Sequence, residues 1–123
     1  MGFDNNKLNR LNKIKKTLNS LNIDIKTLKH LIQGKKLQIV NLILKKKNSL
    51  NKIRQMSKNF KKNEKEKGPG NAHLNYANVL KNVTNIDKKI EKLRKELNEL
   101  ENDKYKLKKQ QNMINIERRK IEN

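Results

Sequence analysis

The sequence contains no cysteine, no tryptophan and one proline, and only 3% of its 123 residues are aromatic. Without cysteine, disulfide bonds and thiolate metal sites are excluded. Hydrophobic residues make up 33% of the chain, which is below the roughly 45–50% typical of a globular domain. A compact globule around a thick aromatic core is therefore not expected. We expect a single elongated helical domain, residues 1–123, with a narrow apolar seam.

Long apolar runs are also absent. No stretch approaches the roughly 18 consecutive apolar residues that a membrane-spanning helix requires. The first residues lack the apolar core of a secretory signal. These absences predict that the chain has no membrane span and acts inside the cell, in the cytoplasm or the nucleus.

The residue patterns of catalytic and ligand-binding sites are missing as well. His30 and His73 are isolated, with no second ligand at the spacing of a metal site. Gly68-Pro69-Gly70 follows no predicted strand and lacks the spacing of a phosphate-binding loop. Acidic residues such as Glu99 and Asp103 fall on one predicted helix, with no cleft to enclose them. We therefore expect no enzymatic activity, no cofactor and no metal.

The charge is strongly basic and unevenly distributed. The formal net charge is +20, of which residues 1–67 contribute +15 (19 Lys and Arg against four acidic residues) and residues 68–123 contribute +5 (13 against eight). Such a field favours acidic partners, including RNA, ribosomes and acidic cytoskeletal surfaces. The bases are mostly Lys, and Asn and Ile are also abundant, which is the bias of an AT-rich coding sequence. The charge therefore has a functional and a compositional interpretation.

The tripeptide Gly68-Pro69-Gly70 is the clearest helix-breaking point in the chain. Helical periodicity continues on both sides of it. We predict an all-α fold, a long antiparallel two-helix coiled-coil hairpin, with a first helix at 5–66, a turn at 67–71 and a second helix at 72–122. The alternative is three helices with a break near Gly34, because a glycine in a helix interior costs about 1 kcal/mol relative to alanine.

In the first predicted helix the apolar residues alternate in steps of three and four, which is the heptad pattern of a coiled coil. The predicted seam begins with Leu11, Ile14, Leu18, Leu21, Ile25, Leu28, Ile32, Lys35, Ile39 and Leu42. Beyond Leu42 the pattern is read through Ile43, Lys46, Leu50, Ile53, Ser57 and Phe60. That path predicts a four-residue insertion, or stutter, in the heptad repeat.

The second predicted helix has the more regular pattern. Eleven of its fourteen seam positions are apolar, which a disordered polar sequence would not produce. These positions are Tyr76, Val79, Val83, Ile86, Ile90, Leu93, Leu97, Leu100, Lys104, Leu107, Gln111, Ile114, Arg118 and Ile121. The three polar exceptions, Lys104, Gln111 and Arg118, all fall in the second half of the helix.

Charge and seam composition predict how the two helices pair. Flanking positions are mostly basic in the first helix and more acidic in the second, so folding one onto the other brings opposite charges together. The preferred antiparallel register pairs Ile53 with Val83, Ile39 with Leu93, and Ile25 with Leu107. A register slipped by one heptad would place Lys35 against Lys104 and is disfavoured.

Residues 37–44 are more apolar than one seam requires, so some of them must lie on a second face of the helix. We predict that this face packs against a partner helix through Ile23, Leu31, Gly34, Leu37, Val40 and Leu44. The glycine would allow a close approach. The alternative is that residues 37–44 only surround the stutter, where the seam widens.

Basic residues cluster around the same stretch. A polyanion could contact Lys35, Lys36, Lys45, Lys46, Lys47, Lys52 and Arg54. No aromatic residues are interleaved to stack on bases. A solvated lysine-rich face is therefore an equally valid interpretation.

The leading functional hypothesis is a non-enzymatic structural subunit that docks in a larger protein assembly through helix packing. A two-helix seam leaves most of each helix exposed, so dimerisation of hairpins or docking on another protein would add stabilising contacts. The alternatives are a basic helical protein that binds RNA or ribosomes, and a binder of an acidic cytoskeletal surface.

Overall fold

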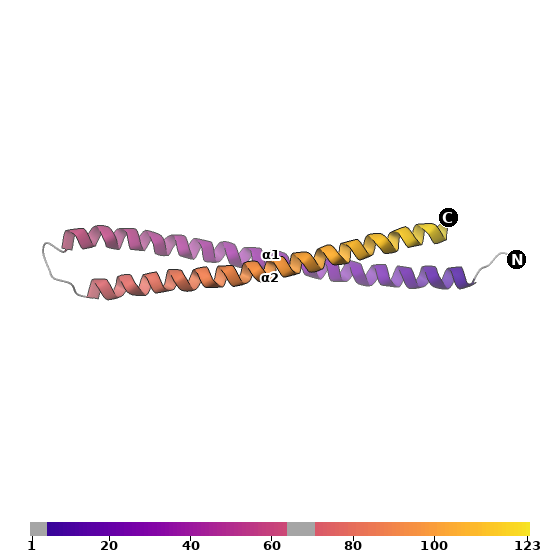
Figure 1. Ribbon diagram of the computed structural model, residues 1–123, viewed down its shortest axis with the longest axis horizontal. Coiled ribbons are helices and arrows are strands. Elements are labelled where there is room, and N and C mark those ends of the chain that lie inside the picture. The colour runs from indigo at the N-terminus through magenta and orange to yellow at the C-terminus, as the bar shows by residue number, and fades with distance from the viewer. Residues whose placement is uncertain (1–4, 64–70) are drawn as a thin grey trace. The chain divides into compact units, whose positions relative to one another are not determined.

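The computed structural model describes residues 5–63 and 71–123, and within them the side chains of residues 5–58 and 75–123. Helix α1 spans Asn5–Asn63 and helix α2 spans Asn71–Glu122, with 59 and 52 residues (Figure 1). The chain is an all-α helical hairpin, which confirms the predicted fold class. The predicted turn at Gly68-Pro69-Gly70 lies outside the described residues.

Helix α1 continues without a break through Gly34, so the three-helix alternative is wrong. No described glycine has a positive φ. The cost of one interior glycine is about 1 kcal/mol. The buried seam positions Ile32 and Ile39, which flank Gly34 on the same helix, offset that cost by packing.

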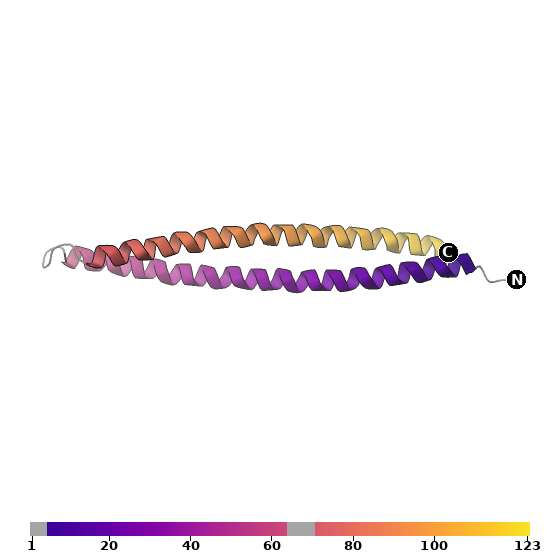
Figure 2. The same cartoon turned by 90° about the horizontal axis from the view of Figure 1, so that it is seen from below.

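The packing divides the chain into two units, each of which contains a segment of both helices: unit 1 is Met1–Gly34 with Leu97–Asn123, and unit 2 is Lys35–Glu96. In unit 1 the buried side chains all come from α1; they are Ile14, Leu18, Leu21, Ile25 and Ile32. The facing seam positions of α2, from Leu97 to Ile121, are half-buried. Figure 2, turned by 90° from Figure 1, shows the two helices of the unit running alongside each other.

In unit 2 the buried side chains are Ile39 of α1 and Val83 and Ile90 of α2. The predicted stutter in α1 is wrong. From Lys35 to Met56 the positions that are buried or half-buried keep the three-four spacing without an insertion; they are Lys35, Ile39, Leu42, Lys46, Ser49, Ile53 and Met56. Ser57, next to Met56, is half-buried as well. Ile43 and Leu50 are instead 42% and 37% exposed.

The unbroken heptad places a lysine and a serine in the seam at positions 46 and 49. The lysine is tolerated because its aliphatic stem covers apolar surface while its ammonium group reaches the edge of the seam. There the Lys46 Nζ lies 2.7 Å from the Asp87 Oδ1. Lys46 lies inward on the stuttered path as well. The stutter was predicted because Leu50 is apolar and Ser49 is polar, whereas in the folded chain Ser49 is the half-buried residue of the two.

The seam of α2 agrees with its sequence pattern. All fourteen predicted positions, from Tyr76 to Ile121, are buried or half-buried. The cross-helix contacts agree with the preferred register in the stretch before the predicted stutter: Lys35 contacts Glu96, and Leu28 and Leu107 line one groove. The predicted pairing of Ile53 with Val83 depended on the four-residue insertion, which the folded chain lacks. The ion pairs between the helices join a base of α1 to an acid of α2, as charge complementarity predicts.

A matched pair of substitutions on α1 tests this division into inner and outer faces. Ile39 is 8% exposed and Leu37 is 62% exposed. We expect Ile39→Ala to lower the free energy of unfolding by about 2–3 kcal/mol. Leu37→Ala should change it by less than about 0.5 kcal/mol. Urea unfolding followed by circular dichroism measures both, and equal effects of the two variants would contradict the packing.

Candidate functional site

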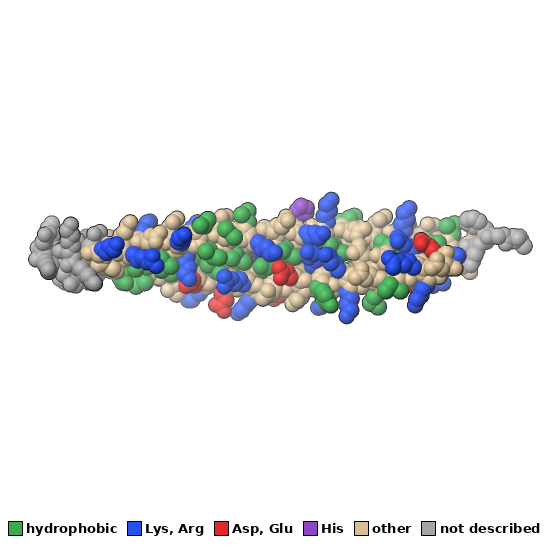
Figure 3. Space-filling model, turned by 90° about the horizontal axis from the view of Figure 1, so that it is seen from above, with side chains coloured by type: hydrophobic (Ala, Val, Ile, Leu, Met, Phe, Trp, Pro, Cys, Tyr) green, Lys and Arg blue, Asp and Glu red, His purple; other side chains and the backbone are tan. Residues whose placement is uncertain are grey.

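The outer face of α1 in unit 2 carries exposed apolar side chains. Leu37, Val40 and Leu44 are 62%, 50% and 54% exposed, and we call these three residues the outer stripe. They are spaced by three and four residues, so they lie on one side of the helix, opposite the buried Ile39. On the face seen in Figure 3, apolar side chains of the protein lie among basic ones. The stripe was predicted from sequence as part of a partner interface.

The charges at the outermost heptad positions also distinguish the outer face of α1 from that of α2. When Ile39 is labelled a, the two outermost positions of the heptad are c and f. Eleven consecutive c and f positions of α1, from Ser20 to Gln55, carry no Lys, Arg, Asp or Glu. In α2, seven of the nine c and f positions from Lys81 to Lys109 are charged. A coding bias towards lysine would act on both helices, so it does not explain the difference.

The other three predicted interface residues belong to unit 1. Ile23 and Leu31 are 65% and 48% exposed. Gly34 is exposed, and apart from its chain neighbours and the adjacent backbone of α1, no heavy atom lies within 4 Å of the place where a Cβ would stand. The glycine therefore leaves open space beside α1 and is not required by any contact inside the described part of the hairpin.

The seven basic residues predicted to contact a polyanion lie in unit 2 but form no single surface. Lys35 and Lys46 are half-buried in the seam. The Lys35 Nζ donates a 2.7 Å hydrogen bond to the Glu96 Oε2, and Lys46 is paired with Asp87. The charges of these two lysines are balanced within the hairpin.

The ion pair with Lys35 also affects the pKa of Glu96. The hydrogen bond from Lys35, together with the positive charges of Lys35 and Lys92, lowers the pKa of Glu96 below its ordinary value of 4.5, although burial acts in the opposite direction. Glu96 is therefore a carboxylate over the whole physiological pH range. Its function is to neutralise a seam lysine.

The remaining five basic residues are exposed on two sides of α1. Lys36, Lys47 and Arg54 occupy e and b positions, and Lys45 and Lys52 occupy g positions. Lys45 and Lys52 line a groove between α1 and α2, together with Lys89 of α2. Sequence reasoning missed Lys89, because only the pairing of the helices brings it to residues some 40 positions earlier.

We call this feature the lysine groove. Its volume is about 400 Å³, and it is lined by Lys45, Asn48, Ser49, Lys52, Asn82, Asn85, Ile86 and Lys89. Seven of these eight side chains can donate a hydrogen bond, and the eighth is Ile86. No carboxylate is among its lining residues.

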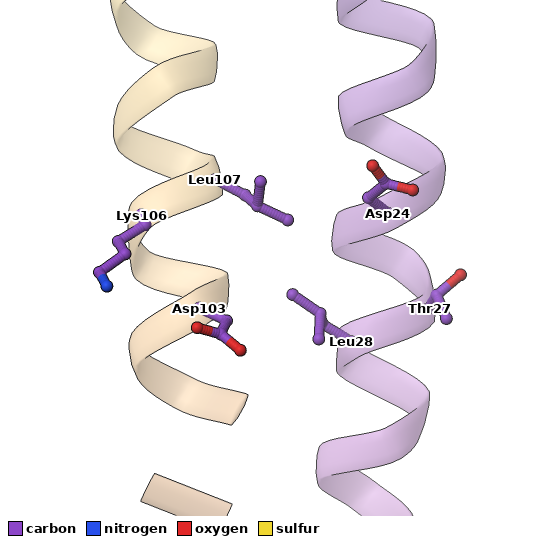
Figure 4. A pocket seen from close by; sticks show the side chains of 6 residues that line it. All are labelled: Asp24, Thr27, Leu28, Asp103, Lys106 and Leu107. Atoms are coloured by element: carbon purple, nitrogen blue, oxygen red, sulfur yellow. The ribbon is translucent and has the colours of Figure 1, made fainter. Parts of the chain in front are cut away.

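Unit 1 contains a second groove, of about 430 Å³, on the same g-position side. Figure 4 shows Leu28 and Leu107 pointing toward each other between the helices, with Asp24 and Asp103 beside them. Two acids therefore occupy the places that lysines occupy in unit 2. Among residues 5–63 and 71–123, no three His, Cys, Asp or Glu side chains are grouped so as to hold a metal ion.

Neither described helix combines the length and the apolar character that crossing a membrane requires. Comparison of the chain with protein-family models, with curated proteins and with solved structures found no match. The class of the protein is therefore defined by its own fold, a helical hairpin.

The Lys35–Glu96 pair generates a pH prediction. Because the pKa of Glu96 is lowered in the folded state, its contribution to stability is present above its ordinary pKa and is lost as the pH falls through the lowered value. The melting temperature of Glu96→Gln should thus lie below that of the wild type at pH 7, and the difference should shrink at lower pH.

Thermal unfolding between pH 2 and 7, followed by circular dichroism, measures this difference. Glu99→Gln is the control, because Glu99 is an exposed residue of the same helix. A wild-type advantage over Glu96→Gln that stayed constant down to pH 2 would contradict the role of the ion pair.

A substitution at Gly34 should increase the stability of the protein, whereas Glu96→Gln should decrease it. Gly34→Ala removes the entropic penalty of glycine and meets open space, so it should raise the free energy of unfolding of the isolated protein by about 0.5–1 kcal/mol. Urea unfolding measures the change. A loss of stability would mean that the position is crowded in the free protein.

Proposed function

We propose that the protein is a non-enzymatic coiled-coil subunit that docks on another protein through the outer stripe of α1, Leu37, Val40 and Leu44. The observation that carries the proposal is the contrast between the two helices. The c and f positions of α1 are uncharged over eleven consecutive places, whereas those of α2 are mostly charged. Apolar side chains at three-four spacing are the surface that a partner helix packs against.

The charges beside the stripe favour an acidic partner. Lys36, Lys45 and Lys47 flank it on α1, and no acidic residue lies between positions 25 and 63 of the sequence. A second copy of the same face would bring basic residues against basic residues, which is disfavoured. The partner that fits is a helix with apolar side chains at three-four spacing and Asp or Glu beside them.

The thin core of the hairpin supports the same proposal. In neither described unit is a side chain less than 2% exposed. A third helix over the outer stripe would cover α1 on the side opposite the seam. Burial of apolar side chains contributes about 25 cal/mol per Å², so covering three large side chains would be a substantial gain.

Site-specific photo-crosslinking in the native cell tests the proposal. A photoreactive amino acid replaces Val40 in one version of the tagged protein and Lys95, an outer residue of α2, in the control version. We expect a discrete crosslinked protein from position 40 and none from position 95. Addition of Leu37→Gln and Leu44→Gln to the first version should abolish the crosslink.

The two glutamine substitutions lie at exposed positions, so the melting temperature of the purified protein should stay within about 3 °C of the wild type. Crosslinks of equal strength from both helices would contradict the proposal. So would unchanged crosslinking after the glutamine substitutions. A product with the mass of two copies would overturn the inference of an acidic partner in favour of self-association.

A further inference from the structure

The lysine groove in unit 2 brings together like charges that the hairpin itself does not balance. Lys45 and Lys89 both occupy g positions, which an antiparallel coiled coil places opposite each other. Lys52 lies one heptad further along α1 on the same side. Unlike Lys35 and Lys46, none of the three is in an ion pair within the described part of the chain. Repulsion among these three charges is therefore not offset by an acid of the described residues.

An anion between the lysines would remove this repulsion. The groove offers three ammonium groups, the amides of Asn48, Asn82 and Asn85, and the hydroxyl of Ser49. Ammonium groups, amides and hydroxyls are common donors to phosphate oxygens in nucleic-acid complexes. The groove of unit 1, which has acids at the same heptad positions, offers no such environment.

The residues that line the lysine groove also favour one class of anionic partner over the others. A partner helix needs an apolar strip in addition to charge, and the lysine groove contains Ile86 as its one apolar lining residue. Binding at a membrane surface likewise depends on buried apolar side chains. A volume of about 400 Å³ is that of a small-ligand site, and the flexible backbone of a single strand can bend to follow a groove of this size, whereas a rigid double helix cannot.

We propose that the lysine groove binds the phosphodiester backbone of single-stranded nucleic acid through Lys45, Lys52 and Lys89, with Asn82 and Asn85 as hydrogen-bond donors. Aromatic side chains are absent from the lining, so bases are not stacked and the binding has no strong sequence preference. The groove and the outer stripe have no residue in common. The two surfaces adjoin at Lys45, which lines the groove and also flanks the stripe.

Fluorescence anisotropy with a labelled oligouridine of about 20 nucleotides tests the proposal on the full-length protein. The variant is Lys45→Gln, Lys52→Gln and Lys89→Gln combined. The control is Lys26→Gln, Lys106→Gln and Lys109→Gln combined, which removes the same charge from exposed positions outside the groove. Affinities are measured between about 50 and 200 mM salt, because each lost phosphate contact on a single strand lowers the log–log salt slope by about 0.7.

We expect the log–log salt slope of the groove variant to be smaller by about 2 and its affinity at low salt to be at least tenfold weaker than those of the wild type. Both quantities should change much less in the control. Thermal unfolding should show the groove variant to be at least as stable as the wild type, because repulsion is removed. Loss of binding thus cannot be attributed to loss of folding. Equal losses in the two variants would overturn the proposal in favour of diffuse attraction to the basic chain.

Binding measurements with other ligands, and with a second groove variant, identify the kind of ligand that the groove binds. A duplex of the same length should bind more weakly than the single strand, and phosphatidylserine vesicles should bind equally to the groove variant and the control. Asn82→Ala combined with Asn85→Ala should weaken oligouridine binding about threefold or more without changing the salt slope, because no charge is removed. Tighter binding of the duplex, or a specific loss of vesicle binding in the groove variant, would refute the single-strand assignment.

Discussion

The hairpin depends on one narrow contact, the seam in which three-four spaced side chains of α1 meet those of α2. Each helix buries one stripe, so no described side chain is as deeply enclosed as in a globular core. Stability is gained in many small layers along the helices and not from one central cluster. Such a seam tolerates Lys35 and Lys46, because every layer lies close enough to solvent for a lysine stem to bring its charge to an acid.

Much of this fold follows from sequence because periodicity and burial are directly connected in a coiled coil. The seam of α2 was predicted position by position, and the helical hairpin followed from two periodic segments. The stutter was the error. Apolar periodicity favoured Leu50 over Ser49, whereas the folded chain keeps the regular heptad. Lys46 lies inward on both paths, so the choice depended on Ser49, whose polar side chain gives no apolar signal in the pattern of α1.

The outer stripe and the lysine groove also differ in how far the sequence alone could predict them. The outer stripe belongs to one helix, so an excess of apolar residues between positions 37 and 44 was sufficient to predict it. The lysine groove belongs to two helices, and its existence depends on their register. A count of basic residues grouped Lys35 and Lys46 with Lys45 and Lys52, although the first two are neutralised by Glu96 and Asp87 and the last two face a groove.

The shallow burial of the seam has a thermodynamic consequence. The heat capacity of unfolding arises mainly from apolar surface that becomes exposed to water. Side chains such as Leu28, Leu93 and Leu107 are only half-buried in the folded chain, so unfolding hydrates less new apolar surface per residue than it does in a globular domain. A small heat capacity change flattens the curve of stability against temperature. The hairpin should therefore retain a nearly constant, modest stability over a wide range of temperatures, including cold conditions that weaken proteins with thick cores.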